Sequence, residues 1–294
     1  MRLQEALRSA IDRLTAAHVG SPRMNAEVLL MFTSGCDRAY LYAHPERELT
    51  TEETTRYDDA LSQRAQGVPS QYITGHQEFW GMDLIVTPAV LIPRPETEHL
   101  IEALLPLAKN IAVPKIVDVG TGSGCIALAL AKELPRAEIH ATDMSPQALE
   151  IARANAARHG LESRIAFLEG DLLEGLPVGF DFVISNPPYV GESEEDQVQL
   201  EVRKFEPRNA VFAGTTGTEV IARLIEQARE KLKPSRFLII EISGTIASEV
   251  CGLLSDWEDV HIKNDLQNIP RVAIARRREK DGPRIYTDAH GSHS

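Results

Sequence analysis

The stretch VISNPPYV (183–190) ends an apolar, strand-forming run with an asparagine, two prolines and a tyrosine. Proline has a fixed φ and no N–H, so Pro187 and Pro188 end the strand and leave a backbone carbonyl without a neighbouring donor. The side-chain carbonyl of Asn186 is a second neutral acceptor. Two such acceptors match the two hydrogens of an –NH2 group, and Tyr189 offers a flat face for a planar amide or base.

This pattern indicates chemistry on a nitrogen atom. The lone pair of an amide nitrogen is delocalised into its carbonyl, so the nitrogen attacks poorly unless it is oriented. Hydrogen bonds from both of its hydrogens orient it and strengthen as positive charge develops, and in-line alignment supplies much of the rest. We therefore predict Asn186, Pro187 and Tyr189 as catalytic residues and 186–189 as the substrate-binding set, with no metal. A rigid proline turn with a buried tyrosine is the structural alternative.

A glycine-rich loop, VDVGTGSGC (117–125), follows a second apolar run and precedes a predicted helix. This is the context of a nucleotide-binding loop, in which a ligand lies against bare backbone. The spacing is Gly-x-Gly-x-Gly, without the Gly-Lys-Ser/Thr of a triphosphate site, and a plain tight turn is the alternative. Asp143 ends the next predicted strand, about 20 residues further on, where such folds place an acid for ribose hydroxyls. The predicted cofactor-binding residues here are Gly120, Thr121, Gly122, Ser123, Gly124 and Asp143.

Asp171 and Leu172 follow the third predicted strand. Asp171 offers an acceptor for an adenine amino group and Leu172 an apolar surface for the ring, although a plain turn residue remains an equal interpretation of Asp171. An acid-lined site suits a cationic ligand without phosphates. S-adenosyl-L-methionine, with an adenosine, a sulfonium and an amino acid end, fits this description. We predict it as the cofactor, with S-adenosyl-L-homocysteine as the product and Asn186 also in contact with it.

These residues need a scaffold, and strand and helix patterns alternate from residue 115 onward. The alternation predicts an α/β fold with a doubly wound, mostly parallel seven-stranded sheet, Rossmann-like, whose last two strands form an antiparallel pair. The carboxyl ends of its parallel strands bring the glycine loop and Asn186 to one crevice. The predicted strands are KIVDVG, EIHATD, RIAFLEGD, FDFVIS, RFLIIEIS, DVHIKND and RVAIARR.

The chain before residue 70 has a helical pattern. Apolar residues at three-and-four spacing from Leu3 to Leu14 predict a first helix, and Thr50 with Glu53 forms a capping-box pattern at the start of a later one. We predict four segments: a helical bundle over 1–68, a β-hairpin linker over 69–95, a cofactor-binding domain over 96–278 and a disordered tail over 279–294.

Composition limits the possible functions. Lys and Arg total 31 against 43 Asp and Glu, a formal net charge of −12. This charge disfavours a protein that grips nucleic-acid phosphates, which calls for a basic face. The three cysteines are far apart, no apolar run approaches the ~20 residues of a membrane span, and the N-terminus lacks a signal-peptide pattern. We expect a cytoplasmic monomer that binds neither nucleic acid directly nor a membrane.

Four further segments accompany NPPY: YITGHQEFWGMDLIVTPAVLIPRPETE, VDVGTGSGCIALALA, FEPRNAVFAG and LQNIPRVAIARR. Together, over roughly residues 1–277, they resemble the peptide chain release factor glutamine methyltransferases, the PrmC/HemK family. The resemblance implies the S-adenosylmethionine-dependent methyltransferase fold and methylation of the side-chain amide nitrogen of the glutamine in the Gly-Gly-Gln motif of release factors. The family's cofactor loop falls on Gly120 to Gly124, its ribose acid on Asp143, its adenine-side position on Leu172 and its amide motif on 186–189. The helical bundle is then a docking surface for the release factor.

The chain departs from the family's pattern in two places. Thr216-Gly217-Thr218 stands where the family usually has Asp-Gly-Leu, and Ser243 stands where it often has glycine. Both departures concern the segments around the active centre rather than the centre itself.

Three alternatives to this function remain. A glutamine methyltransferase of a large-subunit ribosomal protein shares NPPY and the glycine loop, although IPRPETE and IPRV favour the release factor. An adenine methyltransferase of nucleic acid needs a basic face. A module that binds the cofactor without transferring methyl is disfavoured by the intact Asn186 and Tyr189.

Overall fold

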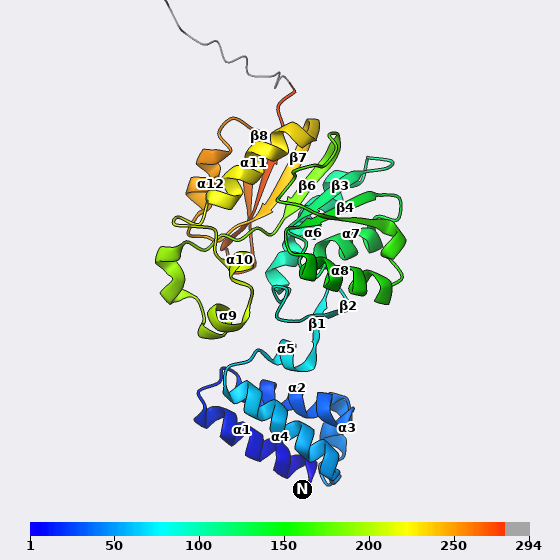
Figure 1. Cartoon of the computed structure of the whole chain (residues 1–294), viewed down its shortest axis with the longest axis vertical. Helices are drawn as coiled ribbons and strands as arrows, with labels where there is room; N and C mark the ends of the chain where they lie inside the picture. Colours follow the sequence, from blue (N-terminus) through cyan, green and yellow to red (C-terminus); the bar gives the residue numbers. More distant parts are fainter. Residues whose placement is uncertain (280–294) are drawn as a thin grey trace, which may run out of the picture.

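The N-terminal helices of the computed structural model, which describes residues 1–279, form a bundle at one end of the molecule (Figure 1). Their aliphatic residues at three-and-four spacing bury one stripe of each helix in a common core. The predicted capping box is confirmed, because Thr50 Oγ1 accepts from the N–H of Glu53 at 3.1 Å and Glu53 accepts from the N–H of Thr50 at 2.9 Å. Helix α3 is short and was not predicted. The helices are α1 (Leu3–Ala16), α2 (Pro22–Ser34), α3 (Arg38–Ala43) and α4 (Thr51–Ala65).

The predicted hairpin is present as β1 (His76–Phe79) and β2 (Met82–Ile85), with Trp80 and Gly81 at positive φ in its turn. It is preceded by a short helix, α5 (Ser70–Thr74), which was not predicted. The hairpin packs on the α/β part, where Phe79, Met82 and Leu84 join the main core. It therefore belongs to that core as well as connecting it to the bundle.

A seven-stranded sheet forms the α/β part, in the order β5-β4-β3-β6-β7-β9-β8. The strands from β3 to β7 pair in parallel, and β9 pairs antiparallel with both β7 and β8. This confirms the predicted doubly wound, mostly parallel sheet and its final antiparallel pair. The strands are β3 (Lys115–Val119), β4 (Glu138–Asp143), β5 (Ile165–Glu169), β6 (Phe180–Ser185), β7 (Leu232–Glu241), β8 (Glu258–Asn264) and β9 (Pro270–Arg276).

Helices cover both faces of the sheet (Figure 1). Successive side chains of a strand point to opposite faces, so Phe182 and Ile184 of β6 join one core cluster and Val183 joins the other. The first cluster is covered by α6 (Glu98–Ala108), α7 (Cys125–Glu133) and α8 (Pro146–Arg158), and the second by α11 (Glu219–Lys231) and α12 (Ala247–Leu253). Helix α6 follows a 3-10 turn, η1 (Pro95–Thr97), and η2 (Glu162–Arg164) precedes β5.

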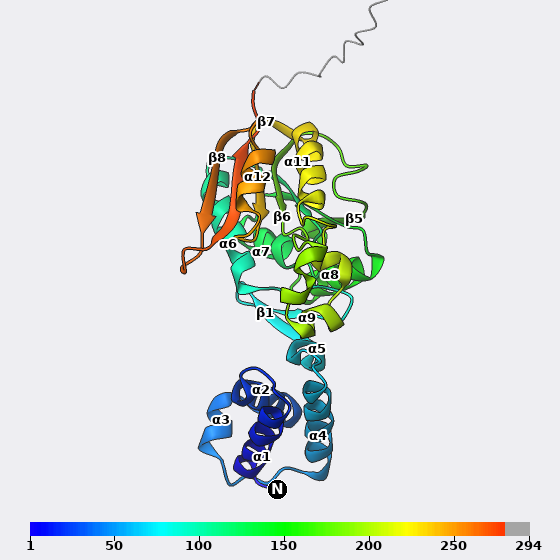
Figure 2. The ribbon, with the colours of Figure 1, turned by 90° about the vertical axis from the view of Figure 1, so that its left-hand side faces the viewer.

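The long segment after β6 carries η3 (Glu192–Gln197), α9 (Leu200–Phe205) and α10 (Arg208–Val211). Figures 1 and 2 both place α9 beside α5, at the side of the α/β part that faces the bundle. Arg64 of α4 reaches Glu201 of α9 at 2.8 Å, so the bundle and this segment are joined by an ion pair.

The predicted tail over 279–294 lies, apart from Glu279, outside the described residues. Between residues 1 and 279, no helix has both the length and the apolar composition of a membrane-spanning segment.

Candidate active site

Three of the predicted site segments lie at one edge of the sheet. In the parallel register Val119 pairs with Thr142 on one side and with Ser185 on the other. The residues that follow these three, Gly120, Asp143 and Asn186, therefore leave the sheet side by side. This is the carboxyl edge, at which α/β sheets bind their ligands.

The glycines of the loop do different jobs. Gly120 and Gly122 have φ of +70° and +56°, and a Cβ built on either one would meet no atom within 4 Å. Both line a cavity of about 320 Å³, the glycine-loop cavity. Gly124 does not line it. A Cβ on Gly124 would come within 3.2 Å of the Cβ of Ala152 and 3.3 Å of Leu128, so this glycine allows α7 and α8 to pack closely.

Asp118, beneath the loop, was missed by the sequence analysis. Its Oδ2 accepts a hydrogen bond from Thr121 Oγ1 at 2.6 Å and from the N–H of Ala127 at 3.2 Å, and it thereby ties the loop to the start of α7. Burial raises the pKa of Asp118 to about 7. Thr121 and Ser123 are themselves buried under the loop rather than exposed to the cavity. The available signal was an acid inside the otherwise apolar strand KIVDV.

Asp143 lines the glycine-loop cavity, as predicted for a ligand-binding acid. Its Oδ2 accepts from the N–H of Gly122 and its Oδ1 from the N–H of Ser145, both at 2.9 Å. Burial raises the pKa of Asp143, and these backbone hydrogen bonds offset part of the rise. Because each oxygen has a further lone pair, the oriented carboxylate can still accept from ligand hydroxyls.

Asp171 and Leu172 line the same cavity. Asp171 forms an ion pair with Arg223 at 2.5 Å, so the wall here is not purely acidic. Leu172 has a positive φ of 54°, and its carbonyl accepts from Thr142 Oγ1 at 2.9 Å, which holds the side chain at the cavity. Bare glycine backbone, a backbone-oriented acid and an apolar side chain together fit a nucleoside ligand.

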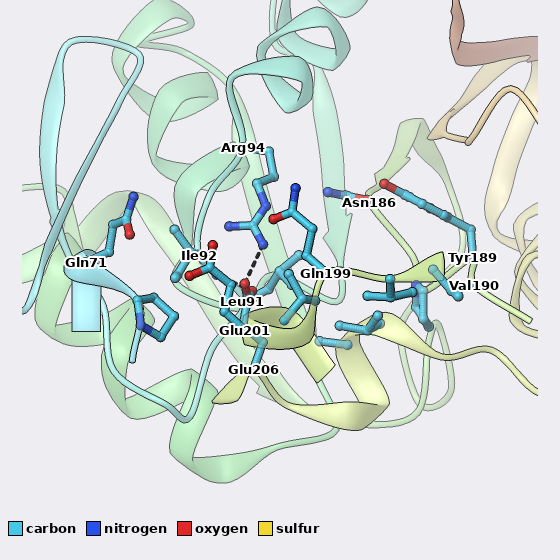
Figure 3. Close-up of a pocket in the computed structure, with 16 residues that line it drawn as sticks. Gln71, Leu91, Ile92, Arg94, Asn186, Tyr189, Val190, Gln199, Glu201 and Glu206 are labelled. Carbon is cyan, nitrogen blue, oxygen red and sulfur yellow. Dashed lines mark hydrogen bonds and ion pairs between the residues drawn. The ribbon is translucent and has the colours of Figure 1, made fainter. Parts of the chain in front are cut away.

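A second cavity, of about 490 Å³, lies beside the first and is called the NPPY cavity here. Figure 3 shows Asn186 and Tyr189 at one end of it, Gln71 at the other, and Arg94 between them. Arg94 forms an ion pair with the buried Glu206, which also accepts from the N–H of Ile92 at 3.2 Å. Neither Arg94 nor Glu206 was predicted. IPRPETE carries Arg94, but a local pattern does not reveal a partner more than a hundred residues away.

Asn186 and Pro188 line both cavities, so the two spaces meet at the NPPY motif. The Nδ2 of Asn186 donates to Thr97 Oγ1 at 3.1 Å, which leaves its Oδ1 to accept from a ligand. Tyr189 lines the NPPY cavity and donates its hydroxyl to Glu241 at 3.3 Å. Pro187 is buried and lines neither cavity through its ring.

The loop that departs from the family's pattern packs on the motif. A Cβ on Gly217, whose φ is +88°, would come within 2.6 Å of the carbonyl oxygen of Tyr189. Glu219 accepts from the N–H groups of Thr216 at 2.8 Å and Gly217 at 2.9 Å. The substitution at residue 216 therefore leaves a hydrogen-bonded turn in contact with the motif.

Two family models match the chain. The PrmC N-terminal domain matches residues 5–75, which include the bundle, and the Methyltransferase small domain matches residues 96–204, which include the glycine loop and NPPY. Among solved structures, the hMettl16 catalytic domain in complex with the MAT2A 3′UTR hairpin 1 is similar with a TM-score of 0.56 at 17% identity, over 82% of this chain and 85% of that one. At this identity the likeness supports the fold alone.

Relatives of similar length are much closer in sequence. A release factor glutamine methyltransferase of Koribacter versatilis is 53% identical over 279 residues, which cover 94% of this chain and 99% of the relative. One of Nitratidesulfovibrio vulgaris is 40% identical over 281 residues, covering 94% and 95%. Identity at this level across nearly the whole of both chains shows that the protein belongs to the release factor glutamine methyltransferase family.

Proposed function

We propose that this protein transfers a methyl group from S-adenosylmethionine to the side-chain amide nitrogen of the glutamine in the Gly-Gly-Gln motif of peptide chain release factors. The observation that carries the proposal is that the glycine-loop cavity and the NPPY cavity meet at Asn186 and Pro188. A methyl donor in one and an amide in the other would face each other at the motif. Membership of the family names the acceptor.

The glycine-loop cavity is our proposed cofactor site. When bound there, S-adenosylmethionine supplies an electrophilic methyl group on a sulfonium. Gly120 and Gly122 let the ligand approach bare backbone, Asp143 accepts from ribose hydroxyls, and Leu172 packs against the adenine. The carboxylate of Asp171 is the proposed acceptor for the adenine amino group, which it would share with its ion pair to Arg223.

The NPPY motif is our proposed acceptor site. The side-chain carbonyl of Asn186 and the backbone carbonyl of Pro187 accept the two hydrogens of the glutamine amide, and the ring of Tyr189 lies against the amide plane. Neutral acceptors hold the nitrogen without removing its proton beforehand, and the hydrogen bonds strengthen as its positive charge develops. Pro188 gives the rigid corner that keeps the two carbonyls in place.

The helical bundle, for which we predict the range 1–68, is our proposed docking surface for the release factor. We propose the hairpin linker (69–95) and the domain over 96–278 as the units that hold this surface against the acceptor site. The ion pair between Arg64 and Glu201 supports this role, because Glu201 also lines the NPPY cavity and so links bundle and site. We further propose that the protein acts as a monomer in the cytoplasm, without direct contact with nucleic acid.

The test is methyl transfer from labelled cofactor to a purified release factor, with the modified residue located by mass spectrometry. We expect the label on the Gly-Gly-Gln glutamine. Label that appears instead on a ribosomal protein or on DNA or RNA reassigns the acceptor. Cofactor binding without transfer to any of these leaves only a binding module.

Asn186→Ala tests the acceptor role. We expect transfer to be lost, by a factor of about 100 or more, since an aligned hydrogen bond to the reacting group is removed. Cofactor affinity should stay within about tenfold, because the glycine loop is intact. Asn264→Ala is the matched control, since Asn264 lies at the end of β8 and bonds only to Asn268 at 2.9 Å. Equal activity of the two variants rejects the role of Asn186.

A further inference from the structure

Three segments converge behind the NPPY motif. Ser185 of β6 pairs with Ile240 of β7, so the next residues along these parallel strands, Asn186 and Glu241, leave the sheet as neighbours. The 3-10 turn η1, which precedes α6, brings Thr97 to the same place. Thr97 and Glu241 are 1% and 2% exposed and line neither cavity, so they touch the site only through other residues.

Each of the two buried residues holds one member of the motif. Thr97 Oγ1 accepts from Asn186 Nδ2 at 3.1 Å, and Glu241 Oε1 accepts from the hydroxyl of Tyr189 at 3.3 Å. The second oxygen of Glu241, Oε2, is buried without a hydrogen-bond partner among the described residues. A buried carboxylate with an unfilled acceptor is costly, and its retention calls for a role.

The direction of the hydrogen bonds decides which atom of Asn186 faces the site. Because Thr97 accepts from Nδ2, the amide oxygen is left for the incoming nitrogen, which itself carries two hydrogens. With the amide flipped, two NH2 groups would face each other and neither could accept. The proton of the Thr97 hydroxyl is free to be donated, and this hydroxyl acts on Glu241, whose pKa it lowers.

We propose that Thr97 and Glu241 are positioning residues for the methyl transfer. Thr97 keeps the carbonyl of Asn186 turned toward the acceptor amide, and Glu241 anchors the Tyr189 ring and the Thr97 hydroxyl from behind. The inference rests on the proposed function, since it assumes that Asn186 accepts from the substrate nitrogen. It also gives a physical reason for the threonine in IPRPETE, which the site itself does not use directly.

The charged surroundings of Glu241 make its ionisation a second handle. The groups that face it are Tyr189, Arg271 of β9, whose Nε bonds Asp265 at 2.8 Å, and Glu96 of η1. Burial raises the pKa of Glu241 to about 7. The ionised carboxylate accepts from both hydroxyls, whereas the protonated group competes as a donor. The transfer rate should therefore rise as pH rises through about 7, and this step should be absent in Glu241→Gln.

The kinetic test compares Thr97→Val, which keeps the shape but lacks the hydroxyl, with Thr97→Ser, which keeps the hydroxyl. In single turnovers at saturating cofactor we expect Thr97→Val to be about 10- to 100-fold slower, because the acceptor is no longer held in line. Thr97→Ser should stay within about threefold of the wild type, and cofactor Kd and release factor KM should change little in both. Thr33→Val controls for loss of a buried hydroxyl, since Thr33 bonds only carbonyls inside α2.

A readout without activity follows the tether itself. In 15N-labelled protein, the side-chain amide of Asn186, assigned with Asn186→Asp, should exchange its hydrogens slowly in the wild type and in Thr97→Ser. It should exchange at least about tenfold faster in Thr97→Val, in which the amide has no acceptor. If Thr97→Val does not fold, Thr97→Ser and the pH profile of Glu241→Gln still decide.

The outcomes separate this inference from the proposed function. Wild-type transfer that is equally fast in Thr97→Val, or a pH profile unchanged in Glu241→Gln, overturns the positioning role and leaves the function standing. A wild-type protein that does not methylate the release factor removes the function. In that case, slow exchange of the Asn186 amide that depends on the Thr97 hydroxyl still supports the tether, and fast exchange in the wild type refutes it.

Discussion

The helical bundle and the carboxyl edge of the sheet both bury acidic side chains, but they treat the charge in opposite ways. In the bundle Glu27 accepts from Arg23 at 3.1 Å and from Arg38 at 2.7 Å, and Glu53 accepts from Arg47 at 2.6 Å. Burial by itself raises the pKa of both carboxyls. The hydrogen bonds and the arginine charges more than offset it, so both pKa values lie below the ordinary range.

At the edge of the sheet the acids have no such compensation. Asp118 and Glu241 each keep one carboxylate oxygen without a hydrogen-bond partner among the described residues. Burial raises the pKa of each to about 7. Arg271 acts on Glu241 through space, yet its own hydrogen bond goes to Asp265.

The difference teaches where the chain gives up stability. A paired acid in the bundle holds helices and loops together, whereas an unpaired buried carboxylate disfavours the folded state at neutral pH. Asp118 ties down the glycine loop, and Glu241 supports Tyr189. Such concessions are common where a site must be held in one geometry.

Glu241→Gln should break the comparison with the largest effect. The pKa of Glu241 is raised from 4.5 to about 7. By linkage, removal of this charge should therefore raise the free energy of unfolding of the α/β part by about 2–3 kcal/mol at pH 8. Trp80 and Trp257 are the two tryptophans and both lie outside the bundle, so fluorescence during urea unfolding reports this part.

Glu226→Gln is the control for that measurement, since Glu226 is exposed on α11 and should change stability by no more than about 0.5 kcal/mol. A Glu241→Gln protein no more stable than this control contradicts the unpaired charge at residue 241.

The pH dependence of the same pair sharpens the comparison. Between pH 4.5 and about 7 the folded protein keeps the proton on Glu241 that the unfolded chain has lost. The contribution of Glu241 to stability is therefore complete below 4.5 and is lost as pH rises through about 7. We expect the advantage of Glu241→Gln to be small near pH 4.5, to grow up to about pH 7 and then to level off. An advantage that is constant across this range argues for packing rather than charge.

Asp143→Ala tests whether an acid of the edge serves a ligand. We expect S-adenosylmethionine to bind more weakly by roughly 1–3 kcal/mol, the contribution of a charge-assisted hydrogen bond. Isothermal titration calorimetry measures it, with Asp58→Ala on the bundle surface as the control. Unchanged affinity in Asp143→Ala rejects the assignment of this residue to the ribose.

Glu27→Gln should have the smallest effect and the opposite sign. It removes charge-assisted hydrogen bonds to two arginines that are themselves largely exposed, so we expect the bundle to lose about 1–2 kcal/mol at pH 7. Hydrogen exchange of α2 and α4, followed by mass spectrometry, reports this locally. Because the pKa of Glu27 is lowered, the loss should disappear as pH falls through its folded value. Stabilisation of the bundle by this change would remove the contrast between the two regions.

Much of this protein could be predicted from local rules. The capping box of Thr50 and Glu53, the alternation of strands and helices, and the glycine loop ahead of α7 all depend on residues close together in the chain. The short helices α3 and α5 were missed, because five or six residues carry too little periodicity to identify a helix.

The sequence by itself therefore determined the fold, the carboxyl edge as the place of the site, and NPPY as its reactive motif. Only the tertiary structure decided what stands behind the motif. Thr97 lies 89 residues from Asn186, and Glu241 lies 52 residues from Tyr189. They meet because β6 and β7 are neighbours in the sheet and η1 is held beside them, an arrangement that depends on strand order and on packing. Burial, which raises the pKa of Asp118 and Glu241, likewise exists only once those layers have come together.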